Sequence, residues 1–194
     1  MEIKLGLMKS KKKNFIFCIF FILLNISLYG QKDNDEIKFS EINVNGIKYN
    51  SSAKDFKMIF GPPESKKVID QTKDGPEGRD YLIIYVYDSI KVMFVKNSNN
   101  KYLSQIIING EKYKVNIKEK SISVGDKIEK LEKYFPNSYK SFLKEKEGSS
   151  EKEKFNLFVN LIVYHGGNKY EPGILKITLR KGIIQSITID FDTA

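Results

Sequence analysis

The residues of this chain that could carry chemistry are few and lie far apart. His165 is the only histidine and Cys18 the only cysteine. An imidazole titrates near neutral pH and can serve as a base or a metal ligand, but a metal site needs several ligands. No second imidazole or suitable thiol can join His165, which precedes Gly166-Gly167. We therefore predict that His165 lies at a strand end beside a turn, and we expect no metal and no other cofactor.

Common motifs of catalysis and nucleotide binding are absent from the sequence. It contains no Gly-x-Ser-x-Gly elbow and no glycine-rich phosphate loop. The stretch DQTKDGPEGRD is rich in carboxylates, but their spacing does not match a calcium-binding EF-hand loop, and we interpret it as an acidic loop. Two carboxylates about 5–10 Å apart across a cleft could still cleave a glycosidic bond. A small hydrolase or carbohydrate-acting protein is therefore the alternative to a noncatalytic protein.

Three tyrosines are the candidates for a binding surface. Tyr81, Tyr85 and Tyr87 in YLIIYVY share one face of a predicted strand by alternation. Aromatic residues are enriched in the centres of protein–protein interfaces. The same face could instead be covered by a helix of its own half, and the pattern does not separate these two interpretations.

The first 30 residues have the pattern of a secretory signal peptide. A basic start that ends at residues 11–13 is followed by an apolar run, Phe15 to Leu24, and by the small Gly30 before Gln31. The run is about half of the roughly 20 residues that a membrane span needs. We expect cleavage near Gly30/Gln31 rather than a retained anchor, and hence a periplasmic or secreted protein with no stable membrane span after cleavage.

The positive charge of the chain partly belongs to this signal. The formal net charge is +9, and five of the lysines lie in the first 30 residues. Arg79 and Arg180 are the only arginines. Proteins that read nucleic acid usually use more arginine, because its planar fork binds phosphate and guanine in two places. We therefore expect no nucleic-acid partner.

After a polar leader at residues 31–36, residues 37–108 predict a first module with one short helix on an antiparallel sheet. Asn45-Gly46 is a strong turn signal, because both residues tolerate a positive φ. Ser52 and Asp55 resemble a capping box, and Gly61 with the following prolines ends the helix. Its expected apolar stripe is Phe56, Ile59 and Phe60. Runs of β-branched and aromatic residues predict strands at 81–87, 91–95 and 102–108.

Residues 109–194 repeat this order and predict a second module. Asn109-Gly110 is again followed by a short helix, with Asp126 expected as N-cap, Glu129 in the third position and Pro136 as the stop. Its expected apolar stripe is Ile128, Leu131 and Phe135. The balanced KEKEGSSEKEK at 144–154 predicts a solvated loop. Strands are expected within 155–164, 175–180 and 183–190, and the last aligns with 102–109.

The predicted fold class is α+β, with two tandem modules that each pack a short helix on an antiparallel sheet. Short connections between the strands favour antiparallel pairing. One helix per half can cover only one face of its sheet, which leaves the other face to the second half, to solvent or to a partner.

A helix that closes in FGPPES, followed by three strands and then repeated, resembles the tandem modules of the beta-lactamase inhibitory proteins. The arrangement is also similar to the small outer-membrane lipoproteins of the BamE type. The second half has Tyr134-Phe135-Pro136 where these would have a Gly-Pro turn, and Phe17 rather than a small residue precedes Cys18. The resemblance implies a fold and a general role in binding another protein, and no site residue.

These observations favour a noncatalytic protein of the cell envelope that binds or scaffolds another envelope protein through a sheet face. We expect it not to be an enzyme. An inhibitor or immunity protein that blocks another protein is the third possibility, and it follows from the resemblance alone.

Overall fold

The structure is a computed structural model, and it describes residues 35–71, 80–97, 100–147, 154–165 and 168–191. These residues belong to one unit, residues 34–194. The predicted signal peptide, most of the acidic loop after Asp70 and the turn at 166–167 lie outside the described residues. No helix in the described ranges is long and apolar enough to cross a membrane.

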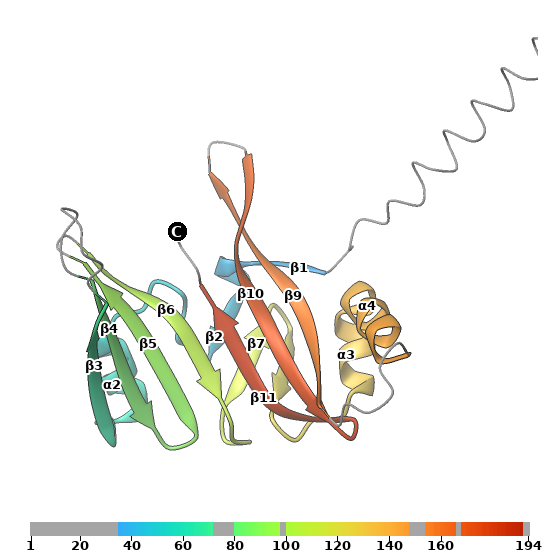
Figure 1. Cartoon of the computed structure of the whole chain (residues 1–194), viewed down its shortest axis with the longest axis horizontal. Helices are drawn as coiled ribbons and strands as arrows, with labels where there is room; N and C mark the ends of the chain where they lie inside the picture. The colour runs from blue at the N-terminus through green and yellow to red at the C-terminus, as the bar shows by residue number, and fades with distance from the viewer. Residues whose placement is uncertain (1–34, 72–79, 98–99, 148–153, 166–167, 192–194) are drawn as a thin grey trace, which may run out of the picture. The chain divides into compact units, whose positions relative to one another are not determined.

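An eight-stranded sheet forms the centre of the fold (Figure 1). Its spatial order is β1-β9-β10-β11-β6-β5-β4-β3, and all neighbours are antiparallel except β1 and β9. In chain order the strands are β1 (Glu36–Lys38), β3 (Ser65–Asp70), β4 (Tyr81–Tyr87), β5 (Ile90–Lys96), β6 (Lys101–Ile108), β9 (Lys154–His165), β10 (Asn168–Arg180) and β11 (Ile183–Asp190).

A smaller sheet and the helices pack on one face of this sheet. The smaller sheet has the order β2-β7-β8, built from β2 (Ile42–Val44), β7 (Lys114–Ile117) and β8 (Lys120–Ser123). The helices are the 3₁₀ helix η1 (Phe39–Glu41), α2 (Ala53–Phe60), α3 (Glu129–Tyr134) and α4 (Pro136–Glu147). Phe56 of α2 packs edge-on against Phe94 of β5 at 5.7 Å between ring centroids, and Phe142 of α4 packs against Phe155 of β9 at 5.9 Å. One continuous core results.

Helix α2 confirms the local prediction in detail. The Ser52 hydroxyl accepts the Asp55 N–H, and the Asp55 carboxylate accepts the Ser52 N–H, which completes a capping box. Gly61 follows with a φ of +83°. The expected stripe is only partly correct, because Phe56 is fully buried and Phe60 packs against the core, whereas Ile59 is 48% exposed.

The second helical region differs from its prediction. Asp126 does not cap a helix: its carboxylate accepts the Ser123 N–H at 2.7 Å and the Lys130 ammonium at 2.8 Å. Pro136 ends α3 but also begins α4, since a proline suits the first position of a helix, where no N–H partner is needed. Residues 144–147 extend α4 rather than starting a loop, and 148–153 lie outside the described residues.

Strand β3 was not expected from the sequence. Its residues SKKVID show no burial alternation, because it is an edge strand whose side chains are almost all exposed. Strands β4, β5 and β6 match the predicted runs to within one residue at each end. The α+β class with an antiparallel sheet is therefore correct in its main lines.

The two expected modules share their sheets. Strand β6 of the first pairs with β11 of the second, from Gln105 opposite Asp190 to Ile108 opposite Ile187. Strand β2 pairs with β7, and β1 pairs with β9, so strands from both sides of the 108/109 boundary are neighbours. The second part has two helices where one was expected. The tandem duplication therefore stays a prediction.

Candidate binding surface

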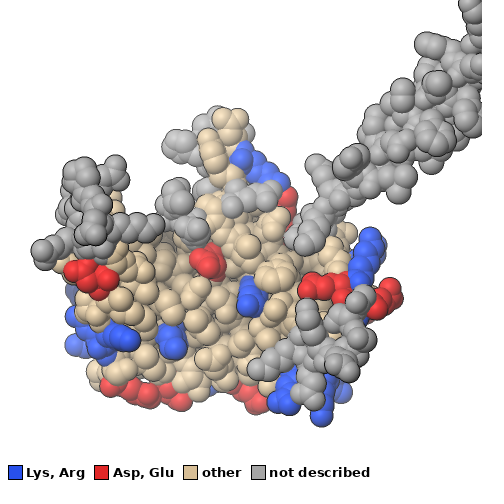
Figure 2. Space-filling view, viewed as in Figure 1, with Lys and Arg blue, Asp and Glu red and all other residues tan. Residues whose placement is uncertain are grey.

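The open side of the eight-stranded sheet is the candidate functional site. We call it the outward face, meaning the side opposite Ile83, Val92, Phe94 and the other buried side chains of these strands. Opposite residues of paired strands point to the same side, so the register assigns each side chain to a face. In Figure 1 the small sheet and α2 lie behind the large sheet, and Figure 2 shows its outward face in the same view.

Half of the outward face is apolar. In the central cross-strand rows of β3 to β6, most outward side chains are hydrocarbon or aromatic, and these apolar side chains are half-buried. The polar exceptions are Ser65, Lys67, Lys91 and Gln105. We call the apolar side chains the apolar patch: Ile69, Leu82, Ile84, Val86, Met93, Val95, Tyr102 and Ile107. They are contiguous, since Leu82 faces Val95 and Ile84 faces Met93 across the β4–β5 ladder. Contiguous exposed apolar surface on a folded protein commonly marks an interaction site.

The β10–β11 side of the face is mainly polar, although Ile174, opposite Asp190, is 43% exposed there. Lys176 lies opposite Thr188 on β11 and opposite Phe158 on β9. The Asp190 carboxylate accepts a hydrogen bond from the Gln105 amide at 3.2 Å, across the seam between β11 and β6. Figure 2 shows the result as a mainly uncharged surface with a few separate basic and acidic side chains.

The predicted tyrosines lie on the other side of the sheet. By alternation they share a face with buried Ile83, and Tyr87 is only 4% exposed, with the ring of Phe60 from α2 at 5.8 Å. Burial raises the pKa of the Tyr87 hydroxyl. Tyr81 and Tyr85 are half-buried and pack against the core. Tyr87 thus contributes to packing. For Tyr81 and Tyr85, whose side chains are partly exposed, a role in binding stays a prediction.

Lysines cover the accessible side of Tyr85. The ammonium groups of Lys66 and Lys101 lie 5.8 and 5.4 Å from the centre of its ring, within the range of cation–π attraction. The Lys101 ammonium also donates to the Tyr85 hydroxyl at 3.4 Å. These lysine contacts occupy the part of the Tyr85 ring that a partner would need to reach. Of the two faces of the large sheet, the outward face is therefore the more open.

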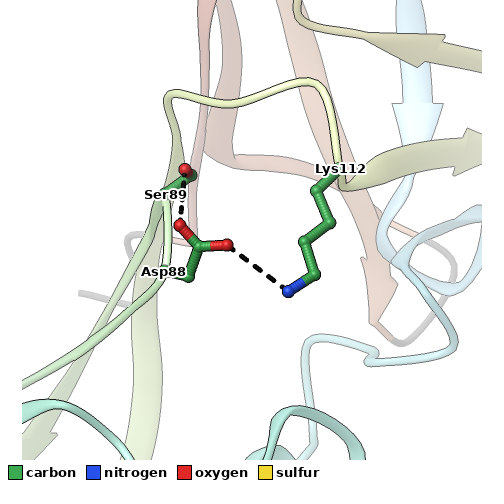
Figure 3. A network of polar contacts seen from close by, with 3 residues as sticks. All are labelled: Asp88, Ser89 and Lys112. Atoms are coloured by element: carbon green, nitrogen blue, oxygen red, sulfur yellow. Dashed lines mark hydrogen bonds and ion pairs between the residues drawn. The ribbon is translucent and has the colours of Figure 1, made fainter.

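A small polar network connects the β4–β5 turn to the segment that follows β6 (Figure 3). In the β4–β5 turn the Ser89 hydroxyl donates to the Asp88 carboxylate at 3.1 Å, and Asp88 pairs with the Lys112 ammonium at 3.4 Å. The Asn109 N–H donates to the Ser89 carbonyl at 2.8 Å. Asn109-Gly110 is therefore a linker held against a turn, whereas Asn45-Gly46 forms a turn with two positive φ angles, 48° and 90°.

No chemical centre is evident in the described part of the chain. Those ranges contain no group of three or more His, Cys, Asp or Glu side chains placed to hold a metal. The backbone of His165 ends β9 and pairs with Asn168, as expected for a strand end beside a turn, while its side chain lies outside the described part. A hollow of about 410 Å³ at the β10–β11 turn has Arg180, Lys181, Ile183 and Gln185 in its described lining.

Sequence reasoning missed the apolar patch because β4 to β6 are apolar on both faces. Apolar and polar residues do not alternate in these strands, so the sequence does not distinguish the core-facing side from the outward side. The aromatic pattern of Tyr81, Tyr85 and Tyr87 indicates the core-facing side instead. The useful signal was the scarcity of helices. One short helix cannot cover both faces of three apolar strands, so one face has to remain open.

Comparisons with known proteins identify no family for this chain. No family model matches it, and no curated protein matches it. Among solved structures, a protein from Streptococcus mutans provisionally named a beta-lactamase inhibitor protein is 15% identical, with a TM-score of 0.24 over 79% of this chain and 93% of that chain. A likeness this distant carries no argument, so the resemblance to the inhibitory proteins and the BamE-type lipoproteins stays a prediction.

Proposed function

We propose that this chain is an exported, noncatalytic protein that binds another protein of the cell envelope through its outward face. The observation that carries the proposal is the apolar patch. It consists of eight contiguous half-buried side chains on a sheet whose own helices and smaller sheet pack on the opposite side. A partner that covers the patch would remove apolar surface from water, which is the main favourable term in protein association.

The patch also has the composition of an interface centre. Its members are Ile, Leu, Val, Met and Tyr, and two lysines lie beside them, Lys91 on β5 and Lys67 on the edge strand β3. Interface centres are depleted of charged residues and enriched in aromatic residues and methionine. A sheet held by a continuous core also changes shape little on binding, which limits the entropic cost of ordering the surface.

The experiment compares two double variants with residues 31–194 as bait. Ile84→Asp with Met93→Asp places two charges in the middle of the patch, on facing positions of β4 and β5. Met58→Asp with Ile59→Asp makes the same change on α2, where the side chains are 67% and 48% exposed. Circular dichroism and urea unfolding first establish that both variants fold.

We expect the wild type and the α2 variant to capture the same protein from an envelope extract in stoichiometric amount, and the patch variant to lose it. The captured protein is then purified and its Kd measured against all three baits. Equal binding by the patch variant and the wild type would refute the proposal. Recovery of sugar polymer alone would favour the carbohydrate-acting alternative.

A further inference from the structure

The charges on the outward face indicate the chemistry of its partner. From β3 to β10, two adjacent cross-strand rows run through the middle of the face. They contain three lysines, Lys67, Lys91 and Lys176, and one carboxylate, Asp190. That carboxylate already accepts a hydrogen bond from Gln105. None of the four ion pairs formed within the described ranges involves these lysines.

Two of the lysines lie in one row at matched positions. Across the strands the row reads Lys91 on β5, Ile107 on β6, Thr188 on β11 and Lys176 on β10. Each lysine is one strand away from the β6–β11 seam. Neighbouring strands are about 4.8 Å apart, so three steps place the two lysine positions about 14 Å apart.

The direct cross-strand neighbours of both lysines are uncharged, and Asp190, which is diagonal to Lys176, accepts its hydrogen bond from Gln105. Lys91 has Val86 and Ile107 as its cross-strand neighbours, and Lys176 has Phe158 and Thr188. Both are half-buried, so part of each alkyl chain is covered while the ammonium group remains available. A partner that covered the face without an acidic group at each site would leave two ammonium groups desolvated and unpaired, which is costly.

We infer that the partner is a protein segment with an apolar centre and two carboxylates about 14 Å apart, which pair with Lys91 and Lys176. This inference rests on the proposed function and specifies its partner. An anionic membrane is the less suitable occupant, because recognition of anionic lipid typically uses clusters of four to eight basic residues rather than two separated by about 14 Å. In an extended segment, with about 3.4 Å per residue, two carboxylates at this distance are about four residues apart.

The test uses a phage-displayed library of random dodecapeptides selected on residues 31–194. We expect enriched peptides with two acidic residues about four positions apart and apolar residues between them. Their binding should weaken about tenfold or more in Lys91→Gln with Lys176→Gln. The matched control is Lys114→Gln with Lys140→Gln, which changes the net charge equally at two exposed sites on β7 and α4 and should bind as the wild type does.

The outcomes separate this inference from the proposed function. Suppose that the peptides fail to bind the Ile84→Asp, Met93→Asp variant but bind the Lys91→Gln, Lys176→Gln variant normally. This result would refute the acidic partner and would still support binding through the outward face. Peptides indifferent to both variants would refute both. Sedimentation with phosphatidylglycerol vesicles that requires Lys91 and Lys176 would overturn the assignment to a protein.

Discussion

Gly110 is a residue at which packing leaves little room for a side chain. A Cβ at this position would lie 2.5 Å from the Ser89 Cβ and 2.6 Å from its Oγ. We expect Gly110→Ala to lower the free energy of unfolding by about 1–3 kcal/mol, as overpacking usually does. Urea unfolding measures the change.

Ser89→Gly supplies the control for this prediction. Ser89 has a φ of +53°, which glycine adopts without strain, and the substitution removes both clashing atoms. The double variant should therefore recover most of the lost stability. An equal loss in the single and double variants would show that the clash is not the cause.

The capping box of α2 predicts a pH effect at a single carboxylate. The hydrogen bonds from the Ser52 side chain and the Ser52 N–H lower the pKa of Asp55. Because the pKa in the folded state is depressed, the stabilisation is present above the ordinary carboxyl pKa and is lost as the pH falls through the lowered value.

We expect the stability difference between the wild type and Asp55→Asn to be present at pH 7 and to disappear in acid. An NMR titration of Ser52→Ala should show the Asp55 pKa moving up towards its ordinary value. A titration unchanged by Ser52→Ala would contradict this account of the cap.

At the scale of elements, Asp35 fixes the start of α4 from a distant part of the chain. Its carboxylate accepts the N–H groups of Asn137 and Ser138 at 3.0 and 2.9 Å, and its own N–H donates to the buried Ser138 hydroxyl. These are helix N–H groups that have no partner within the helix. Asp35→Ala should cost about 1 kcal/mol, as the loss of an N-cap does.

Hydrogen exchange separates this cap from a general loss of stability. The Asn137 and Ser138 amides should lose protection in Asp35→Ala more than the amides of β10 do. Asp35→Asn keeps an acceptor oxygen and should retain part of the protection. Uniform loss across the molecule would contradict a local cap.

Helix α2 offers a matched pair of substitutions on one element. Phe56 is fully buried and packs against Phe94 and Phe60, whereas Ile59 is 48% exposed. Phe56→Ala should cost about 3–5 kcal/mol and Ile59→Ala less than about 0.5 kcal/mol in urea unfolding. Similar costs at both positions would mean that the helix packs through a different face.

These elements show how far the sequence predicts the fold. Local signals placed α2 and β4 to β6 well, because caps and β-branched runs act over a few residues. The sequence does not predict β3, because an exposed edge strand needs no apolar alternation. Pro136 is compatible with two interpretations, because proline occurs both after the end of a helix and at the first position of one. The cap from Asp35 joins residues about a hundred positions apart, and no local pattern encodes it.

At the scale of the molecule, the pairing of the two halves was the least predictable feature. The parallel β1–β9 pair and the β2–β7 and β6–β11 ladders join residues far apart in the chain, and no local pattern says which strand edges meet. The apolar patch was unpredictable for a different reason, because all its members lie on β3 to β6 within the first half. It became visible only when the register showed which side of β4 to β6 the helices leave open.

The shared sheets predict a single unfolding transition. If residues 37–108 and 109–194 were independent modules, each would keep its core when the other unfolds. Here β6 needs β11 and β2 needs β7, and one cluster of buried side chains includes Ile42, Val92, Ile117 and Ile187. Far-ultraviolet circular dichroism and tyrosine fluorescence should therefore give coincident urea transitions for residues 31–194. A fragment that ends at residue 108 should not fold alone, because it exposes the β6 edge and leaves β2 without its partner. Two separated transitions, or a folded fragment, would restore the picture of two modules and would place the patch within the first of them.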